Sequence, residues 1–467
     1  MEFTRKKILI IALYFLVGLF FMYKYNYVIN ISSIHNLSSV NYINLVFSYF
    51  LVVGIFVFLC IKKNCDIFEP FIFCSIIMIL IFIVTPLINM ILNDTYSFGV
   101  YVMGASLKAT WIFNLSYISF CLGYFSIKIR DKMETTLITS SLYLYRKKIV
   151  KTSVVLWILS FTLVVVYLIT KGFNLSYILT LGTGGNLLDQ SNGSGTLLGF
   201  LSMFGYMCVT LWLLIVVFSK SLVLKGLTGI LTLLILIFQG FRFIIVIMIL
   251  APIIYYYIKI GKRPTPLTWF FLGLMLTAMI IIIGFTRNNI SSGLTISWGD
   301  INLDFAIEVI KGNFDIYKSY YGVINAVPNE MGFTYGKQFL YTFIMLIPRF
   351  IWPNKPEPLQ AELVELGLNK TASLSGFAFP NLGEYYSEFG IIGSILILFI
   401  LGKIIAKCKL LYQGSNRNEN TVIIYSVILP ACMQLIIRGY TPSNFYLIFF
   451  LIAPVWIVNK TIRMKIK

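Results

Sequence analysis

Residues Tyr42 to Ile61 read YINLVFSYFLVVGIFVFLCI, a run of twenty residues without one charged side chain. A helix needs about 20 mostly apolar residues to cross the hydrocarbon core of a bilayer. This run is long enough to do so, and it carries no charge that lipid would penalise. The stretch therefore predicts a transmembrane helix.

Runs of the same kind recur along the whole chain. The others lie near 8–23, 70–92, 109–127, 152–170, 197–219, 222–239, 241–258, 266–285, 390–406, 421–437 and 443–459. Hydrophobic residues make up 58% of the 467 residues and charged residues only 12%, a composition that requires lipid as solvent. We therefore predict an all-α polytopic integral membrane protein with about 12 transmembrane helices.

The basic residues predict the orientation of these helices. If the N-terminal Arg5, Lys6 and Lys7 are cytoplasmic, 25 of the 37 Lys and Arg residues fall on the cytoplasmic side. If the long external loop described next is left out of the count, only five lie on the outer side: Lys24, Lys108, Lys171, Arg242 and Arg438. Both termini are predicted to be cytoplasmic. The net charge of +19 indicates no nucleic-acid partner, because the basic residues form short runs between apolar segments.

One large polar segment divides the chain. Residues 1–285 carry predicted helices 1–9, residues 286–389 form an external loop, and residues 390–467 carry helices 10–12 and the cytoplasmic C-terminus. The loop holds ten of the eighteen acidic residues. Because it is too long for a structureless connection, we expect it to fold against the membrane domain and to carry the chemistry.

Two helices are expected within this loop. Apolar residues recur at helical spacing over 304–327, which predicts an amphipathic helix on the outer surface. They are Phe305, Val309, Ile316, Tyr317, Tyr320 and Ile324. Residues 338–347 are apolar, but the run is short and Pro348 follows it. We interpret this run as an interfacial or re-entrant helix, not as a span.

Four arginines stand at outer helix ends or in the loop, against the positive-inside pattern: Arg242, Arg287, Arg349 and Arg438. Arg242 lies in the turn QGFRF, at or inside the outer leaflet. A charge there is costly, and a planar guanidinium suits two-point binding of phosphate oxygens. Each arginine taken alone could instead reach lipid headgroups. Four on one side favour a shared anionic ligand.

The stretch IPRFIWPNKP, residues 347–356, sets an aromatic side chain beside two cations. Its prolines hold Trp352 in an extended or turned segment near Arg349 and Lys355. Such a group could stack a sugar ring and hold a phosphate. A tryptophan anchor at the membrane interface is the alternative interpretation.

The stretch NLGEYYSEFG, residues 381–390, precedes the tenth predicted span. A carboxylate at an apolar boundary, here Glu384, is a stronger base than one in water and could accept a proton from a hydroxyl. Capping of a helix N-terminus is the commoner role of such a glutamate.

The sequence gives no support for a metal or a cofactor. It has no Walker loop, no GxGxxG after a strand, no HExxH and no CxxC, and its seven cysteines lack metal-ligand spacing. Asp300 and Asp304 could hold a divalent ion, but charge on a helix surface explains them better. We expect neither a metal site nor a cofactor.

These motifs resemble the O-antigen and capsular oligosaccharide repeat-unit polymerases of the Wzy type. The resemblance rests on Ile347 to Pro356, on GEYYSEFGIIG at Gly383 to Gly393, and on the arginines that follow Gly240 and precede Gly439. The order of elements matches over Gln239 to Asn444. The resemblance implies a GT-C-like membrane glycosyltransferase in the bacterial cytoplasmic membrane with an outward-facing active site.

The resemblance also implies a reaction and its participants. Repeat units on undecaprenyl diphosphate serve as donor and acceptor, and a chain-length regulator is a candidate partner. We assign Glu384, Arg242 and Arg349 to catalysis, with Glu384 as the base. Substrate binding is assigned to Arg287, Arg438, Trp352, Lys355 and Tyr385.

Three other functions are compatible with parts of the pattern. An O-antigen ligase-type glycosyltransferase shares the loop and the arginines. A flippase for the lipid-linked unit would also have about twelve spans, but transporters of this kind tend to show repeated halves, which are not visible here. A membrane scaffold would not need the arginines.

Overall fold

The computed structural model describes most of the chain. Outside the described part lie residues 1, 26, 29–34, 64–67, 95, 98–99, 102, 128–144, 171–194, 240–241, 266, 269–272, 275–314, 348–350, 356–358, 360–361, 364–377, 414–417 and 464–467.

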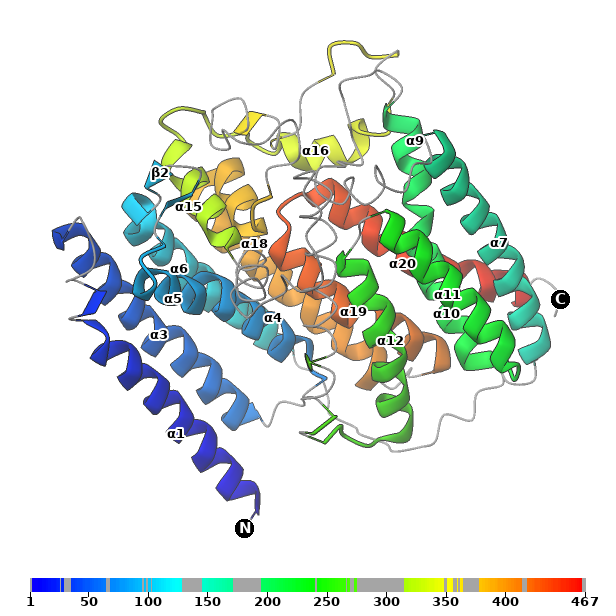
Figure 1. Ribbon diagram of the computed structural model, residues 1–467, viewed down its shortest axis with the longest axis horizontal. Coiled ribbons are helices and arrows are strands. Elements are labelled where there is room, and N and C mark those ends of the chain that lie inside the picture. The colour runs from blue at the N-terminus through cyan, green and yellow to red at the C-terminus, as the bar shows by residue number, and fades with distance from the viewer. Residues whose placement is uncertain are drawn as a thin grey trace, which may run out of the picture.

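The described chain is built from helices (Figure 1). The first are α1 (Glu2–Tyr23), α3 (His35–Lys63), α4 (Pro70–Ile79), the π-helix η1 (Leu80–Val84), α5 (Thr85–Ile91), the 3₁₀-helix η2 (Met103–Ala105), α6 (Ser106–Phe125) and α7 (Arg146–Thr170). Next come α9 (Gly195–Ser202), α10 (Phe204–Phe218), α11 (Leu222–Phe238) and α12 (Arg242–Ile260). The last are α15 (Ile316–Ala326), α16 (Lys337–Ile344), α18 (Asn381–Gln413), α19 (Glu419–Ile437) and α20 (Thr441–Arg463). Strands β1 (Tyr96–Ser97) and β2 (Val100–Tyr101) form one antiparallel hairpin.

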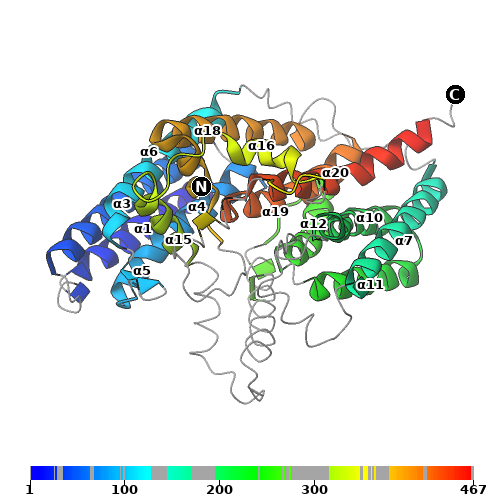
Figure 2. The ribbon, with the colours of Figure 1, turned by 90° about the horizontal axis from the view of Figure 1, so that it is seen from above.

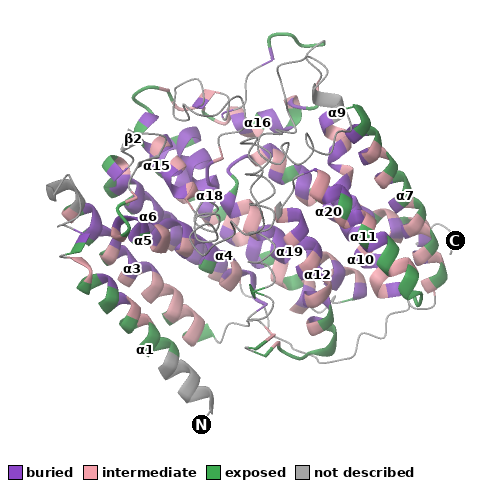
Figure 3. Cartoon of the chain, viewed as in Figure 1, coloured by how far each residue is buried: buried purple, intermediate pink, exposed green. Residues whose placement is uncertain are grey.

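The long apolar helices confirm the predicted fold class. Eight described helices are long and apolar enough to cross a membrane, and α1 and α11 contain shorter apolar stretches. Large apolar side chains stay exposed on the outer helices α1, α3 and α7 (Figure 3), as lipid-facing surfaces require. Most of the predicted span at 266–285 lies outside the described residues.

The helices pack around two apolar cores. The first lobe holds α1, α3, α4 to α6, α15 and α18, and the second holds α7, α9 to α12, α16 and α20. Helix α19 lies between the lobes and contributes buried side chains to both cores, for example Leu429 to the second and Cys432 to the first. Figure 2 shows α19 between α4 of the first lobe and α12 of the second.

Glycines let α6 and α18 approach closely. A Cβ atom at Gly123 of α6 would lie 2.1 Å from the Phe399 carbonyl oxygen, and one at Gly402 of α18 would lie 2.4 Å from the Phe120 oxygen. The Ser119 hydroxyl also donates to the Ile395 oxygen at 2.8 Å. In lipid there is no hydrophobic driving force between helices, so small residues stabilise such crossings by letting the helices pack closely. The contact gives α18, which carries the GEYYSEFG stretch, a firm support.

The described loop helices differ in part from the expectation. Helix α15 places Tyr317, Tyr320 and Ile324 on a buried face as predicted, but it does not lie on the outer surface. It is inserted among η2, α6 and α18 and is buried on most sides. The prediction of a surface helix was wrong because its tyrosine hydroxyls and Lys318 find polar partners inside the first lobe. Phe305 and Val309 lie outside the described residues.

Helix α16 is a short helix, as expected for residues 338–347. Its eight residues span about 12 Å, far less than the roughly 30 Å of a hydrocarbon core. Leu340 and Phe343 are exposed, while Gln338, Tyr341 and Thr342 are buried. Figures 1 and 2 show α16 lying along the start of α20.

Helix α18 breaks at the point where the predicted loop meets the tenth span. Phe389 has φ −138° and Gly390 has φ +66°, so two helical segments meet there. The positive φ of Gly390 favours glycine, because a Cβ atom would strain that conformation. The break separates the short segment with Glu384 and Glu388 from the long apolar part of the helix.

Candidate functional site

The two lobes meet where the start of α18 crosses the turn between α19 and α20. The Gly439 N–H donates to the Phe379 carbonyl oxygen at 2.6 Å. A Cβ atom at Gly439 would lie 2.4 Å from the Pro380 carbonyl oxygen, so only glycine allows the two backbones to come this close. We call this crossing, Phe379–Glu384 with Arg438–Thr441, the lobe junction.

Glu384 ties the lobe junction together. Its side chain is 1% exposed, and both carboxylate oxygens accept the Thr441 N–H, each at 3.1 Å. Thr441 is the first residue of α20, where N–H groups lack partners within the helix. A negative charge is favourable at that position because of the helix dipole. Glu384 therefore caps α20, a helix 57 residues away in the sequence.

Glu388, one turn further along α18, does the same for α16. Its Oε1 accepts the Gln338 N–H at 2.9 Å, and its Oε2 accepts the Gly336 N–H. Gly336 has φ +88°, a left-handed conformation that turns the chain into α16. Two glutamates four residues apart on the first lobe thus hold the N-termini of two helices of the second lobe.

Lys355 holds the other end of α16. Its ammonium group donates to the carbonyl oxygens of Met345 and Ile347, at 3.0 and 3.1 Å, and lies 5.3 Å from the centre of the Tyr341 ring. The side chain is 3% exposed. A cation suits a helix C-terminus, where carbonyl groups lack partners. Trp352 is 38% exposed, so part of its ring is accessible.

Tyr385 lies inward beside Glu384. Its ring stacks on Phe339 of α16, with an interplanar angle of 12°. The neighbouring Tyr386 donates its hydroxyl to the Val327 carbonyl oxygen at 3.1 Å, and its ring lies 5.2 Å from the ammonium of Lys108. The two tyrosines pack the start of α18 against the described part of the loop.

The arginine positions gather in part. The Arg438 guanidinium lies 5.6 Å from the centre of the Phe243 ring, and Phe243 follows Arg242 at the start of α12. At the opposite ends of these antiparallel helices, Lys259 and Glu419 form an ion pair at 3.1 Å. Arg438 and the backbone of Arg242 therefore lie at one end of the helix pair. The Arg242 side chain, Arg287 and Arg349 lie outside the described residues.

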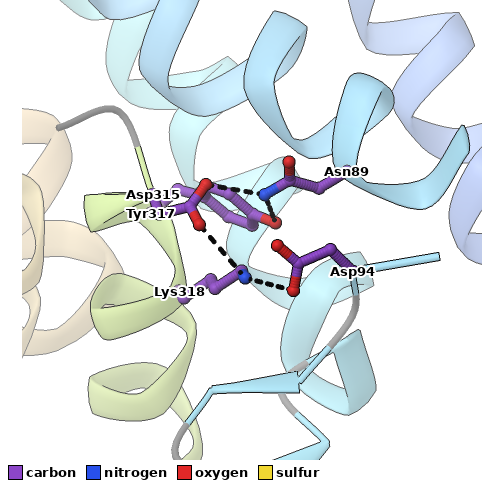
Figure 4. A network of polar contacts seen from close by, with 5 residues as sticks. All are labelled: Asn89, Asp94, Asp315, Tyr317 and Lys318. Atoms are coloured by element: carbon purple, nitrogen blue, oxygen red, sulfur yellow. Dashed lines mark hydrogen bonds and ion pairs between the residues drawn. The ribbon is translucent and has the colours of Figure 1, made fainter. Parts of the chain in front are cut away.

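A polar network anchors α15 to the first lobe (Figure 4). The Lys318 ammonium pairs with Asp94 at 2.7 Å and with Asp315 at 3.2 Å. The Asn89 amide nitrogen donates to Asp315 at 2.7 Å and to the Tyr317 hydroxyl at 2.9 Å. Burial raises the pKa of Tyr317 well above its usual value, so its hydroxyl stays protonated.

Tyr440 is the aromatic residue in the turn of the lobe junction. Burial raises its pKa well above the usual value, and the nearby Tyr341 and Glu384 add to that effect. Among the described residues, no group of His, Cys, Asp and Glu is arranged to hold a metal ion. The lobe junction brings together a buried carboxyl group, an arginine and the hydroxyl of Tyr440.

The family model for O-antigen polysaccharide polymerase Wzy matches residues 8–466. The chain belongs to this family. The resemblance inferred from the loop motifs is confirmed, and the match extends beyond Gln239–Asn444 to nearly the whole chain. Neither a curated protein nor a solved structure matches.

Membership of the Wzy family, together with the apolar helices, makes this a multi-pass membrane protein of O-antigen polysaccharide polymerisation. The lobe junction contains parts of two elements on which the resemblance was based, the start of the GEYYSEFG stretch and Arg438–Gly439. Sequence reasoning did not find the capping by Glu388 or the role of Thr441. The available signal was a pair of acidic residues four apart, followed later by Thr441-Pro442, a typical helix start.

Proposed function

We propose that this chain joins oligosaccharide repeat units carried on undecaprenyl diphosphate, at the outer face of the bacterial cytoplasmic membrane. A hydroxyl oxygen of the acceptor unit forms a bond to the anomeric carbon of the donor glycan. The bond from that carbon to the diphosphate oxygen breaks, and undecaprenyl diphosphate leaves with the electron pair. The hydroxyl proton passes to a base.

The observation that carries this proposal is the closeness of Glu384 and Arg438 in the lobe junction. Glu384 binds the N–H of Thr441, which lies only three residues after Arg438. The transfer needs a base, because the acceptor hydroxyl must lose a proton. It also needs a cation, because the leaving diphosphate carries negative charge. Each carboxylate oxygen that accepts one N–H keeps a further lone pair for a hydroxyl.

Arginines stabilise the leaving group in this proposal. Undecaprenyl diphosphate leaves as an anion, so it needs positive charge more than a proton. Arg242, Arg349, Arg287 and Arg438 are assigned to the two diphosphates. By analogy with the loss of an oxyanion donor, removal of one transition-state contact should cost about 2.7–4 kcal/mol.

The remaining assigned residues serve sugar binding. The accessible part of the Trp352 ring offers an apolar face on which a sugar can stack. Lys355 holds the Trp352 segment against the end of α16 through its contacts with Met345 and Ile347. Tyr385 borders Glu384 and shapes the site next to the base.

Purified protein in liposomes tests the reaction directly. Lipid-linked repeat units are added without any nucleotide, and products are resolved by size on a gel. We expect ladders of linked repeat units, because the energy of the reaction resides in the donor diphosphate bond. Folded protein that produces no ladder would overturn the proposal, and transfer of finished glycan to another acceptor would indicate a ligase.

Variants in cells test the residue assignment. Alanine at Arg242, Arg349 and Glu384, introduced singly, should leave lipid-linked single repeat units and little polymer. Protein levels in the membrane serve as the control for folding. Normal polymer length and yield in all three variants would show that the assignment is wrong.

A further inference from the structure

Buried polar atoms without partners gather where α16 packs against α20. Gln338 is fully buried, and neither atom of its side-chain amide has a partner among the described residues. One helical turn later on the same face, the Thr342 hydroxyl is also buried without a described partner. Buried polar groups are nearly always hydrogen-bonded in native proteins, so two neighbouring exceptions require an explanation.

The other helix presents the same feature. The Tyr440 hydroxyl and the Asn444 Oδ1 atom are buried, and the described part of the chain offers neither of them a partner. The two helices are in direct contact there, because the Tyr446 hydroxyl donates to the Thr342 carbonyl oxygen at 2.7 Å. Tyr341, between Gln338 and Thr342, is also buried, and it lies near Tyr440.

We propose that this α16–α20 face, made by Gln338, Thr342, Tyr440 and Asn444, is a subsite for a neutral, hydroxyl-rich sugar ring of the glycan. The inference rests on the proposed function for the presence of a glycan. Because the atoms are closed off when α16 is in place, α16 moves relative to α20 when the sugar binds. Glu388 and Lys355 hold the two ends of α16 through polar contacts. The movement of α16 would break these contacts and let the same groups form new ones.

The chemistry of the unpaired atoms selects this ligand class. They comprise two carbonyl-type acceptors, one amide donor and two hydroxyls, and none of the four side chains carries a charge. A sugar hydroxyl both donates and accepts, so it can pair with all of them. A diphosphate has only acceptors and would face the amide oxygens of Gln338 and Asn444, while a polyprenyl chain could pair with none. The rings of Tyr341 and Tyr440 add the aromatic surface on which sugars pack.

The test compares two lipids on full-length purified protein. One probe is the lipid-linked repeat unit extracted from cells that lack this polymerase, and the other is undecaprenyl diphosphate without sugar. The main variant is the double substitution Gln338→Leu with Thr342→Val, which replaces unpaired polar groups by apolar groups of similar shape. Binding affinity for each lipid and the thermal midpoint without lipid are measured.

We expect the double variant to lose affinity for the lipid-linked repeat unit without losing thermal stability. Affinity for the lipid-linked repeat unit falls about tenfold, while affinity for undecaprenyl diphosphate is unchanged. The thermal midpoint without lipid stays level or rises, because no hydrogen bond is lost. Tyr440→Phe, which removes one hydroxyl only, should weaken binding of the repeat unit several-fold with the same stability.

Thr210→Val is the matched control. Its hydroxyl is equally buried but donates to the Leu451 carbonyl oxygen at 2.8 Å, so this variant should lose stability and keep its affinity for both lipids. The inference is overturned if the double variant binds the repeat unit like wild type, or if it loses stability and both affinities together. If the wild-type protein binds and elongates repeat units and the variants behave in the same way, only this subsite is refuted. If the wild-type protein neither binds nor elongates repeat units, the proposed function is refuted as well.

Discussion

Both carboxylate oxygens of Glu384 lie 3.1 Å from the backbone nitrogen of Thr441, so a single acidic side chain joins the start of α18 to the start of α20. The contact links the two lobes at the point where Arg438 ends α19. Glu384 therefore has a structural role as a helix cap in addition to the catalytic role as a base that we propose. The two roles should respond differently to substitution.

Glu384→Gln should separate these roles. The amide keeps one oxygen that can accept the Thr441 N–H, so the protein should stay folded. It cannot take up a proton, and loss of general-base catalysis should slow polymerisation by about 10²–10⁴-fold. The measurement is initial rate in liposomes beside the thermal midpoint. A fully active Glu384→Gln protein would mean that Glu384 acts only as a cap.

Glu384→Ala should in addition destabilise the lobe junction. The Thr441 N–H is left without its acceptor, and an unsatisfied, partly buried donor typically costs about 1–3 kcal/mol. Thermal unfolding in detergent should show the loss directly. Glu330→Gln, a change on an exposed residue, is the control and should leave both rate and stability unchanged.

Lys355→Met should loosen α16 at its C-terminal end. The carbonyl oxygens of Met345 and Ile347 lose their donor, so hydrogen exchange of the α16 amides should accelerate by about tenfold. Mass spectrometry of exchanged peptides measures this, and Lys220→Met, at an exposed position outside α16, should show no change. Weaker binding of lipid diphosphate with unchanged exchange would instead support a direct contact between Lys355 and substrate.

The membrane helices could be predicted from sequence because run length and charge asymmetry are local properties. The run at 42–61 lies inside α3, and the boundary expected at 389–390 coincides with the break in α18. The buried position of α15 was not predictable in this way. The periodic spacing of apolar residues predicts that one face of the helix is buried. It does not predict that Asn89 of α5 and Asp94, in the loop after α5, bind polar groups on the other face of α15.

The candidate site could be predicted only in its location. The sequence indicates a functional role for the GEYYSEFG stretch, and it is compatible with capping of a helix N-terminus by Glu384. The helices that its glutamates cap, however, lie 50 or more residues away in the chain. Such contacts depend on how the lobes pack, which no periodicity encodes. The unpaired atoms of Gln338 and Thr342 are equally invisible in the sequence, since an amide and a hydroxyl usually find partners.

Gly439→Ala should disrupt the lobe junction through backbone alone. The new Cβ atom would lie 2.4 Å from the Pro380 carbonyl oxygen, and neither backbone segment can move like the end of a flexible side chain. Overpacking of this kind costs about 1–3 kcal/mol. We expect less protein in the membrane and a lower thermal midpoint. Gly332→Ala has open space around the added methyl group and should behave like wild type.

Lys318→Met should release α15 from the first lobe. The substitution leaves Asp94 and Asp315 facing each other without the cation between them, in a partly buried place. Losing these charged hydrogen bonds should cost about 1.5–3 kcal/mol and expose α15 to protease. Adding Asp94→Asn removes part of the uncompensated charge, so the double variant should be more stable than Lys318→Met alone. If the second substitution restores nothing, the ion pair does not hold α15, and packing of Tyr317 and Tyr320 does so instead.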